Sequence, residues 1–324
     1  MSMVAAKVRA EIGLFVYLAM WYAGNYQYNI YNKLSSKAAG GAEFAFTLAW
    51  LQLVVGSVYG IFLWAAPDAR AKPNCSFAQI MKLAPLGFWA AAAHAGAVFA
   101  MSAGAVSFGQ IVKAAEPAFA VIVGYTIYGK LESKAKVAML VPIIGGIMIA
   151  SAQELDFTVG ALVAGCTANV ASAFRGQENK SVLADPALKA AIGSGGNVYA
   201  ITTLWATIFV FPLIFVSGEY AKMDKFREMW AADGLPGSTG LVYNTLMAGL
   251  AFYMYNEVST LALKKISGVT HSVANTAKRA IIIVGCAIAF GESMAPLKML
   301  GCAVAIGGTF FYAIIDDLIK PKKA

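Results

Sequence analysis

Apolar runs of about the length needed to cross a membrane recur from one end of the chain to the other. A transmembrane helix needs about 20 mostly apolar residues to cross a hydrocarbon core of about 30 Å. Ten runs approach that length, so the sequence predicts an all-α integral membrane protein with ten transmembrane helices. The predicted spans are Glu11–Asn29, Ala45–Ala65, Leu83–Ala103, Val106–Tyr128, Val137–Ala152, Thr158–Ala173, Val198–Val216, Gly240–Leu261, Thr270–Phe290 and Lys298–Ile315.

The composition excludes a soluble globular chain and several kinds of partner. Of the 324 residues, 59% are hydrophobic and only 13% are charged. Although the net charge is +8, no basic patch interleaved with aromatic residues predicts a nucleic-acid partner. The four cysteines show neither disulfide nor metal-ligand spacing, so we expect no metal and no other cofactor.

The basic residues are distributed unevenly between the two sides of the predicted bundle. With ten spans, the termini and the even-numbered loops carry 16 of the 25 Lys and Arg residues, and the odd-numbered loops carry 6. Because basic loops stay on the cytosolic side, we expect both termini on that side or on its topological equivalent in an organelle.

A shift of 162 residues, half the chain, superimposes parts of the sequence on itself. It places Gly129, Gly145 and Gly146 on Gly291, Gly307 and Gly308. With five spans in each half, the second half has to enter the membrane from the opposite side, as in the inverted repeats of many secondary transporters. We therefore expect two five-helix repeats, residues 1–153 and 154–324, that form one transport domain with substrate between them.

The ninth run carries polar residues at membrane depth. Its uncharged part, Ala280–Phe290, is too short to span the membrane at about 1.5 Å per residue, so the helix has to begin earlier. Lys278 and Arg279 then lie inside the membrane, where an unpaired charge costs several kcal/mol. His271 and Asn275 precede them on the same helical face. This pattern favours an anion site in a watery cavity over two surface residues at a helix end.

Lys113 is a second intramembrane cation, because the stretch that follows it, Ala114–Tyr128, is also short for a span. The repeat shift places Lys113 on Asn275, so both halves direct a polar helix at the same region. Glu116 is a candidate salt-bridge partner for Lys113 at a spacing of three residues, and Pro117 predicts a kink. We expect Lys113 to contact substrate, the usual role of intramembrane charge.

Four further polar residues lie in or near the predicted spans, and three of them have two interpretations. His94, in the small-residue third run, either binds substrate or hydrogen-bonds a neighbouring backbone group. Tyr255, beside Asn256 in the eighth run, either packs in the core or donates a hydrogen bond to a substrate oxygen. Arg175, near the end of the sixth run, either extends to the lipid headgroups or serves in gating or substrate binding.

Three interior cations with hydrogen-bond donors nearby suit a dianion such as phosphate. Arginine offers a planar fork to two phosphate oxygens, whereas lysine acts as a point charge. An occluded empty site with three positive charges is unstable, and bound phosphate neutralises most of that charge. We therefore expect only the loaded carrier to reorient readily, which predicts obligatory exchange. The sequence leaves open whether the carrier is a monomer or a homodimer.

Several of these motifs resemble those of the plastid sugar-phosphate/phosphate translocators, a family of the drug/metabolite transporter superfamily. KAAEPAF at 113–119 resembles their fourth-helix motif and VTHSVANTAKR at 269–279 their ninth-helix motif; FYMYNE at 252–257 and GGTFFY at 307–312 match in order. The resemblance implies ten helices and strict antiport of inorganic phosphate for phosphorylated three-, five- or six-carbon compounds. It also implies that Lys113, Lys278 and Arg279 bind the phosphate and that Tyr255 and His94 contribute to substrate binding.

The residues that distinguish the substrate branches of this family resemble different branches in this chain. His94 resembles the triose-, pentose- and hexose-phosphate carriers, Ala97 the glucose-6-phosphate carriers, and Thr270–Ser272 the triose-phosphate and phosphoenolpyruvate carriers. Glu257 replaces the usual Gln. We favour exchange of phosphate for triose phosphate or 3-phosphoglycerate in the plastid inner envelope or a surrounding plastid membrane.

Other functions stay open at this point. The chain is either such a carrier, an exchanger for another phosphorylated sugar or phosphoenolpyruvate, or a nucleotide-sugar carrier of the Golgi or endoplasmic reticulum with the same fold. No paired intramembrane carboxylates and no activated Ser or Cys predict an enzyme. No Ser- and Arg-rich transit segment precedes the first run, so we expect a targeting signal to be internal or to have been trimmed.

Overall fold

The computed structural model describes residues 3–152, 158–233, 240–263 and 268–319, and every regular element within these ranges is a helix. The long helices are α1 (Met3–Ala38), α2 (Ala45–Ala65), α4 (Ala84–Ala103), α7 (Lys134–Ala152), α8 (Val159–Ala184), α10 (Gly195–Val216), α12 (Leu241–Leu263), α13 (Gly268–Phe290) and α14 (Pro296–Ile319). The short ones are η1 (Gly41–Phe44), α3 (Phe77–Met81), α5 (Val106–Lys113), α6 (Glu116–Thr126), α9 (Pro186–Ile192), η2 (Glu219–Lys222) and α11 (Met223–Ala232).

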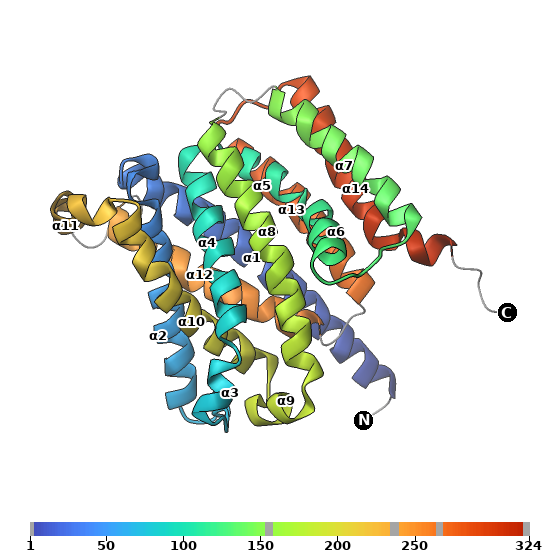
Figure 1. Ribbon diagram of the computed structural model, residues 1–324, viewed down its shortest axis with the longest axis horizontal. Helices are drawn as coiled ribbons and strands as arrows, with labels where there is room; N and C mark the ends of the chain where they lie inside the picture. The colour runs from blue at the N-terminus through green and yellow to red at the C-terminus, as the bar shows by residue number, and fades with distance from the viewer. Residues whose placement is uncertain (1–2, 153–157, 234–239, 264–267, 320–324) are drawn as a thin grey trace.

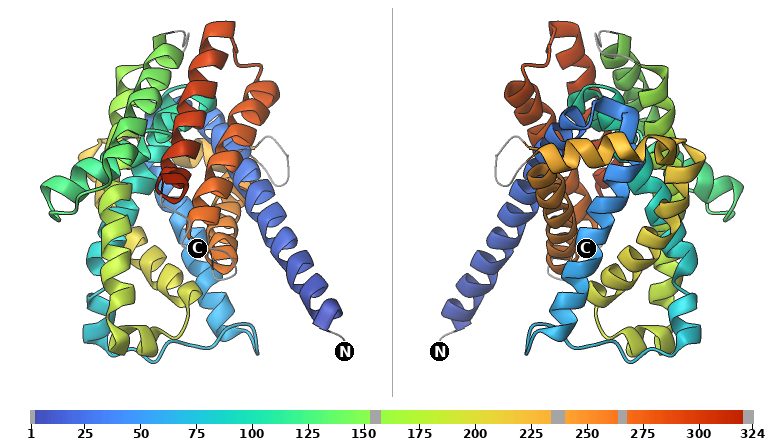
Figure 2. Two further views of the ribbon diagram at one scale, coloured as in Figure 1. Left: turned by 90° about the vertical axis from the view of Figure 1, so that its right-hand side faces the viewer. Right: turned by 90° about the vertical axis from the view of Figure 1, so that its left-hand side faces the viewer.

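The long helices run back and forth between two faces of the molecule (Figures 1 and 2). One face, called here the terminal face, carries the N-terminal end of α1 together with α3 and α9 (Figure 1). The opposite face, called the far face, carries α11, the α4–α5 junction and the α13–α14 loop (Figure 1). Capping side chains set several helix starts: Ser194 before α10 and Thr158 before α8 each accept a backbone N–H at 3.1 Å.

Seven stretches of the described chain are long and apolar enough to cross a membrane. They are Gly41–Ala65, Phe77–Ala103, Val106–Thr126, Lys134–Ala152, Gly195–Val216, Thr270–Phe290 and Pro296–Ile319. Each coincides with one of the ten predicted spans. The other three predicted spans, the first, sixth and eighth, fall on α1, α8 and α12, which are helices of 36, 26 and 23 residues with more polar side chains. The chain is therefore an all-helical, multi-pass membrane protein, as predicted.

The fourth predicted span is two helices. α5 ends at Lys113, and α6 begins at Glu116 with Pro117 in its first turn. Proline lacks the N–H that would continue the preceding helix, but its fixed backbone suits the start of a new one. The kink predicted at Pro117 is thus a break, which places Lys113 and Glu116 on different helices.

The most extensive helix packing joins segments far apart in the sequence. α1 packs on α12, α4 on α8, and α7 on α14. Small residues permit this close approach: a Cβ atom at Gly96 of α4 would lie 2.9 Å from the carbonyl oxygen of Ala164 on α8. Each of these pairs combines a helix that precedes residue 153 with one that follows residue 157. The predicted boundary between the halves, at 153/154, lies outside the described residues.

Arg70, in the loop between α2 and α3, ties three segments together near the terminal face. Its guanidinium forms an ion pair with Glu257 of α12 and donates to the Tyr253 hydroxyl at 3.0 Å and to the Gly196 carbonyl at 3.4 Å. The Arg70 and Glu257 side chains are only 10% and 16% exposed. The glutamate that departs from the family motif therefore has a buried partner in this chain.

Replacing Arg70 by alanine should destabilise the protein by roughly 2 kcal/mol or more, because the carboxylate of Glu257 then stays inside without a counter-charge. Adding Glu257→Gln to Arg70→Ala should recover most of the loss, since the neutral amide needs no ion pair. Melting temperatures of the purified variants in detergent give the comparison. Equal melting temperatures for the single and the double variant would contradict this account.

Candidate functional site

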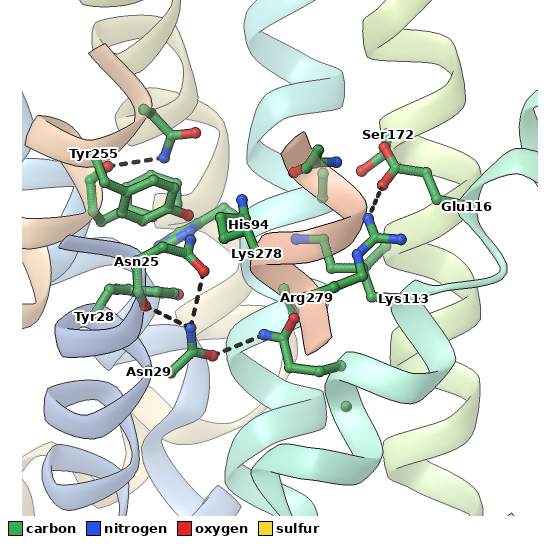
Figure 3. A pocket seen from close by; sticks show the side chains of 18 of the residues that line it. Asn25, Tyr28, Asn29, His94, Lys113, Glu116, Ser172, Tyr255, Lys278 and Arg279 are labelled. Carbon is green, nitrogen blue, oxygen red and sulfur yellow. Dashed lines mark hydrogen bonds and ion pairs between the residues drawn. The ribbon is translucent and has the colours of Figure 1, made fainter. Parts of the chain in front are cut away.

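A cavity of about 230 Å³ lies between helices of both halves of the chain. All ten residues singled out in the sequence line it: His94, Lys113, Glu116, Arg175, Tyr255, Asn256, His271, Asn275, Lys278 and Arg279. They come from α4, α5, α6, α8, α12 and α13, and Figure 3 shows several of them around one space. The structure thus brings the predicted residues together, while their roles toward a substrate stay predictions.

One face of α13 supplies two of the cations. Arg279 is only 6% exposed, so it lies inside the protein rather than at a membrane surface. The Nζ atom of Lys278 lies 4.7 Å from the ring centroid of Trp21 and 5.7 Å from that of Tyr255. Aromatic faces attract a cation, which compensates part of the cost of burying this charge. The imidazole ring of His271, two turns before Lys278, stacks on the same Trp21 ring, with 4.7 Å between the two ring centroids.

The predicted salt bridge between Lys113 and Glu116 is wrong. Glu116 instead accepts from the Nη2 atom of Arg279 at 2.7 Å (Figure 3). The break between α5 and α6 removes the continuous helical turn on which the predicted spacing depended, and it turns Glu116 toward α13. In the described part of the chain, Lys113 and Lys278 form no ion pair. The cavity therefore holds positive charge that its own carboxylate does not balance.

Two side chains of the cavity have polar atoms without a hydrogen-bond partner. The His94 ring, only 5% exposed, lies beside the backbone of Ala49, but neither ring nitrogen makes a hydrogen bond of normal geometry to the described residues. Asn169 of α8 donates to the carbonyl of Val112 at 2.8 Å, next to Lys113, and its Oδ1 atom has no partner within the same ranges. Since buried polar groups are almost always paired, a ligand or water is the expected partner of both.

Several cavity residues were missed in the sequence. Asn29 donates to the carbonyl of Asn25 at 2.7 Å and accepts from Gln110 at 2.8 Å (Figure 3). Trp21 belongs to the same helix, α1, and lies below Lys278. Asn25 and Asn29 are four residues apart in the first apolar run, the same spacing that singled out His271 and Asn275. That periodicity was the available signal.

The cavity continues toward the terminal face. A second cavity of about 310 Å³ shares Glu116, Asn275 and Arg279 with the first and extends to Lys136 of α7 and Tyr312 of α14. Toward the far face, Lys33 of α1 closes the bundle by donating to the carbonyls of Met101 at 3.0 Å and Gly104 at 2.6 Å. The site thus has an adjoining cavity on the side of α7 and α14.

Comparisons with known proteins agree with this arrangement. The sequence profile of the Triose-phosphate Transporter family matches residues 12–313. A chloroplast triose phosphate/phosphate translocator of non-green plastids from Brassica oleracea var. botrytis is 31% identical over 318 residues, which are 96% of this chain and 74% of that protein.

Two further relatives carry other substrates in their names. The glucose-6-phosphate/phosphate translocator 1 of Arabidopsis thaliana is 31% identical over 95% of this chain and 78% of its own length. The phosphoenolpyruvate/phosphate translocator 3 of Oryza sativa subsp. japonica is 33% identical over 97% and 77%. A solved crystal structure with 16% sequence identity superimposes over 97% of this chain and 99% of its own with a TM-score of 0.55, which indicates a shared fold.

Proposed function

Since the chain belongs to the triose-phosphate transporter family, we propose that it is an obligatory antiporter of inorganic phosphate and a phosphorylated three-carbon compound. It is a transporter and not an enzyme, and it is a multi-pass membrane protein of plastids. The relatives' names share phosphate and differ in the second substrate. Exchange between phosphate and a phosphorylated metabolite is thus the common element.

The observation that carries this proposal is the charge inside the cavity. Four cations line it, Lys113, Arg175, Lys278 and Arg279, against one carboxylate, Glu116. A doubly charged phosphate group neutralises most of this excess, and Arg279 offers it a planar fork. A cavity that closes around uncompensated positive charge is costly, so the empty carrier should reorient slowly. Because the loaded carrier then reorients faster than the empty one, transport in one direction requires transport in the other, which is strict exchange.

The polar atoms of the cavity that lack protein partners suit a small phosphorylated substrate. His94 and Asn169 offer hydrogen-bond partners to the hydroxyl or carboxylate end of a three-carbon phosphate. We therefore keep triose phosphate and 3-phosphoglycerate as the favoured counter-substrates, with another phosphorylated sugar or phosphoenolpyruvate as the alternative.

The proposed architecture has ten transmembrane helices in two inverted repeats. α1, α8 and α12 supply the three spans beyond the seven apolar ones, and their extra polar residues face the cavity. The packing supports the repeat: if α1 and α4 correspond to α8 and α12, the contact of α1 with α12 is the counterpart of that of α8 with α4. Gly129 and Gly291, which the 162-residue shift superimposes, share positive φ angles of 61° and 63°.

Uptake of labelled phosphate into proteoliposomes tests the proposed exchange. Vesicles are loaded with phosphate, dihydroxyacetone phosphate, 3-phosphoglycerate, phosphoenolpyruvate or glucose 6-phosphate, or left empty. We expect uptake only into loaded vesicles, fastest with a three-carbon phosphate inside. Equal uptake into empty vesicles contradicts antiport, and no uptake under any loading contradicts phosphate exchange and favours a nucleotide-sugar carrier.

A further inference from the structure

Glu292, in the loop between α13 and α14, forms hydrogen bonds with the first residues of α5 at the far face. Its Oε1 atom accepts from the backbone N–H of Val106 at 2.8 Å, and its Oε2 atom accepts from that of Ser107 at 3.0 Å. The first N–H groups of a helix have no partner within the helix, and the helix dipole favours a negative charge there. One carboxylate thus holds two amides of α5 from a different half of the chain.

Other charged groups strengthen the same corner. Lys298 of α14, only 1% exposed, donates to the Ser107 hydroxyl at 3.1 Å and to the Ser293 carbonyl at 3.0 Å. Lys33 binds the last carbonyls of α4, just before the junction. Cations at a helix C-terminus and an anion at a helix N-terminus both suit the helix dipoles. The α4–α5 junction is therefore held by electrostatic contacts rather than by apolar packing alone.

The two helices joined by Glu292 are the two that carry the proposed phosphate ligands. α5 has eight residues, which corresponds to a length of about 12 Å, with Val106 at one end and Lys113 at the other. α13 carries Lys278 and Arg279 and ends at Phe290, two residues before Glu292. A phosphate held between Lys113 and the α13 cations joins α5 to α13 at the cavity, and Glu292 joins the same helices at the far face.

From this geometry we propose that Glu292 is a positioning residue for the phosphate site. Its contact with the α5 N-terminus holds Lys113 opposite Lys278 and Arg279, and bound phosphate in turn stabilises the Glu292 contact. The coupling rests on the proposed function of the cavity. Because linkage between two binding events is reciprocal, phosphate has to strengthen closure at the far face by the same factor by which Glu292 strengthens phosphate binding.

Hydrogen exchange on the protein in lipid nanodiscs measures both sides of this coupling. In the natural sequence, saturating inorganic phosphate should slow exchange of the amides of residues 101–107 by about tenfold, within the usual range of allosteric coupling. In Glu292→Gln these amides should exchange faster without phosphate, and phosphate should no longer slow them. The phosphate concentration for half-saturation should rise by about tenfold in this variant, with partial recovery in Glu292→Asp.

Glu219→Gln is the matched control. Glu219, at 4% exposure, likewise accepts from two backbone N–H groups at a helix start, those of Phe46 at 2.9 Å and Thr47 at 2.7 Å, but α2 carries no cavity residue. Its loss should speed exchange at 46–47 and leave the response of residues 101–107 to phosphate unchanged. Normal phosphate affinity in Glu292→Gln, or an undiminished phosphate effect on its 101–107 amides, overturns the coupling.

The outcomes also separate this inference from the function on which it rests. If the natural sequence binds phosphate but its 101–107 amides exchange at the same rate with and without it, the coupling is wrong and the proposed function stands. If the natural sequence binds no phosphate at any concentration, the proposed function is wrong and the coupling falls with it.

Discussion

Replacing Arg279 by glutamine is expected to reduce phosphate exchange by at least about thirtyfold. Loss of one partner of a buried, hydrogen-bonded charge pair costs about 2–5 kcal/mol, and each 1.4 kcal/mol is a factor of ten. The change removes the guanidinium fork from the phosphate and also leaves Glu116 unpaired, so an anion then faces the incoming anion. Initial rates of phosphate uptake into phosphate-loaded vesicles, over a range of external phosphate, measure the loss.

Two further variants show whether the effect comes from the cavity. Arg227→Gln removes an arginine from α11 whose side chain is 72% exposed, and exchange should stay at the level of the natural sequence. Combining Arg279→Gln with Glu116→Gln should recover part of the lost affinity, because the unpaired carboxylate is gone. An exchange rate of Arg279→Gln within about threefold of the natural rate would exclude Arg279 as a phosphate ligand.

Adding a single methyl group at Gly146 should prevent α7 from packing on α14. A Cβ atom at this position would lie 2.5 Å from the backbone nitrogen of Ala305 and 2.6 Å from the carbonyl oxygen of Gly301. Both are backbone atoms, so neither can move aside without shifting the helix. We expect Gly146→Ala to lose roughly 3 kcal/mol or more of stability. Melting temperatures in detergent provide the measurement.

The adjacent glycine supplies the control for this prediction. Nothing lies within 4 Å of a Cβ atom at Gly145, so Gly145→Ala should be neutral or stabilising by up to about 1 kcal/mol, from the lower cost of ordering alanine in a helix. The glycines 162 residues further along show the same contrast, since Gly308 is crowded by Ile143 and Gly307 is open. Similar melting temperatures for Gly146→Ala and Gly145→Ala would contradict the packing argument.

The sequence was sufficient to predict that the polar residues of α13 face the interior, because they recur with the period of an α-helix. Lys278 and Arg279 lie too deep in an apolar run to be surface residues, and His271 and Asn275 share their face. The same period on α1 carried Asn25 and Asn29, which line the cavity and were overlooked. Helical periodicity therefore predicts which side chains face inward, but only where it is applied to every span.

Pairs between distant segments could not be predicted in this way. Glu116 was paired with its neighbour Lys113, but the helix break directs it to Arg279, 163 residues away. Glu292 and Arg70 lie in loops, where no periodicity indicates a partner. Their contacts with α5 and with Glu257 depend on how the helices pack, which a single sequence without aligned relatives does not reveal.

The aromatic ring beneath Lys278 has a consequence for turnover. The Nζ atom of Lys278 lies over the Trp21 ring and Arg279 is paired with Glu116, so a phosphate that binds these two cations as proposed has to displace both contacts. Such competition lowers the affinity for any anion that enters. For the proposed exchanger this competition is an advantage, because a substrate held too tightly would not leave on the opposite side, and Trp21 and Glu116 contact the two cations again as it departs.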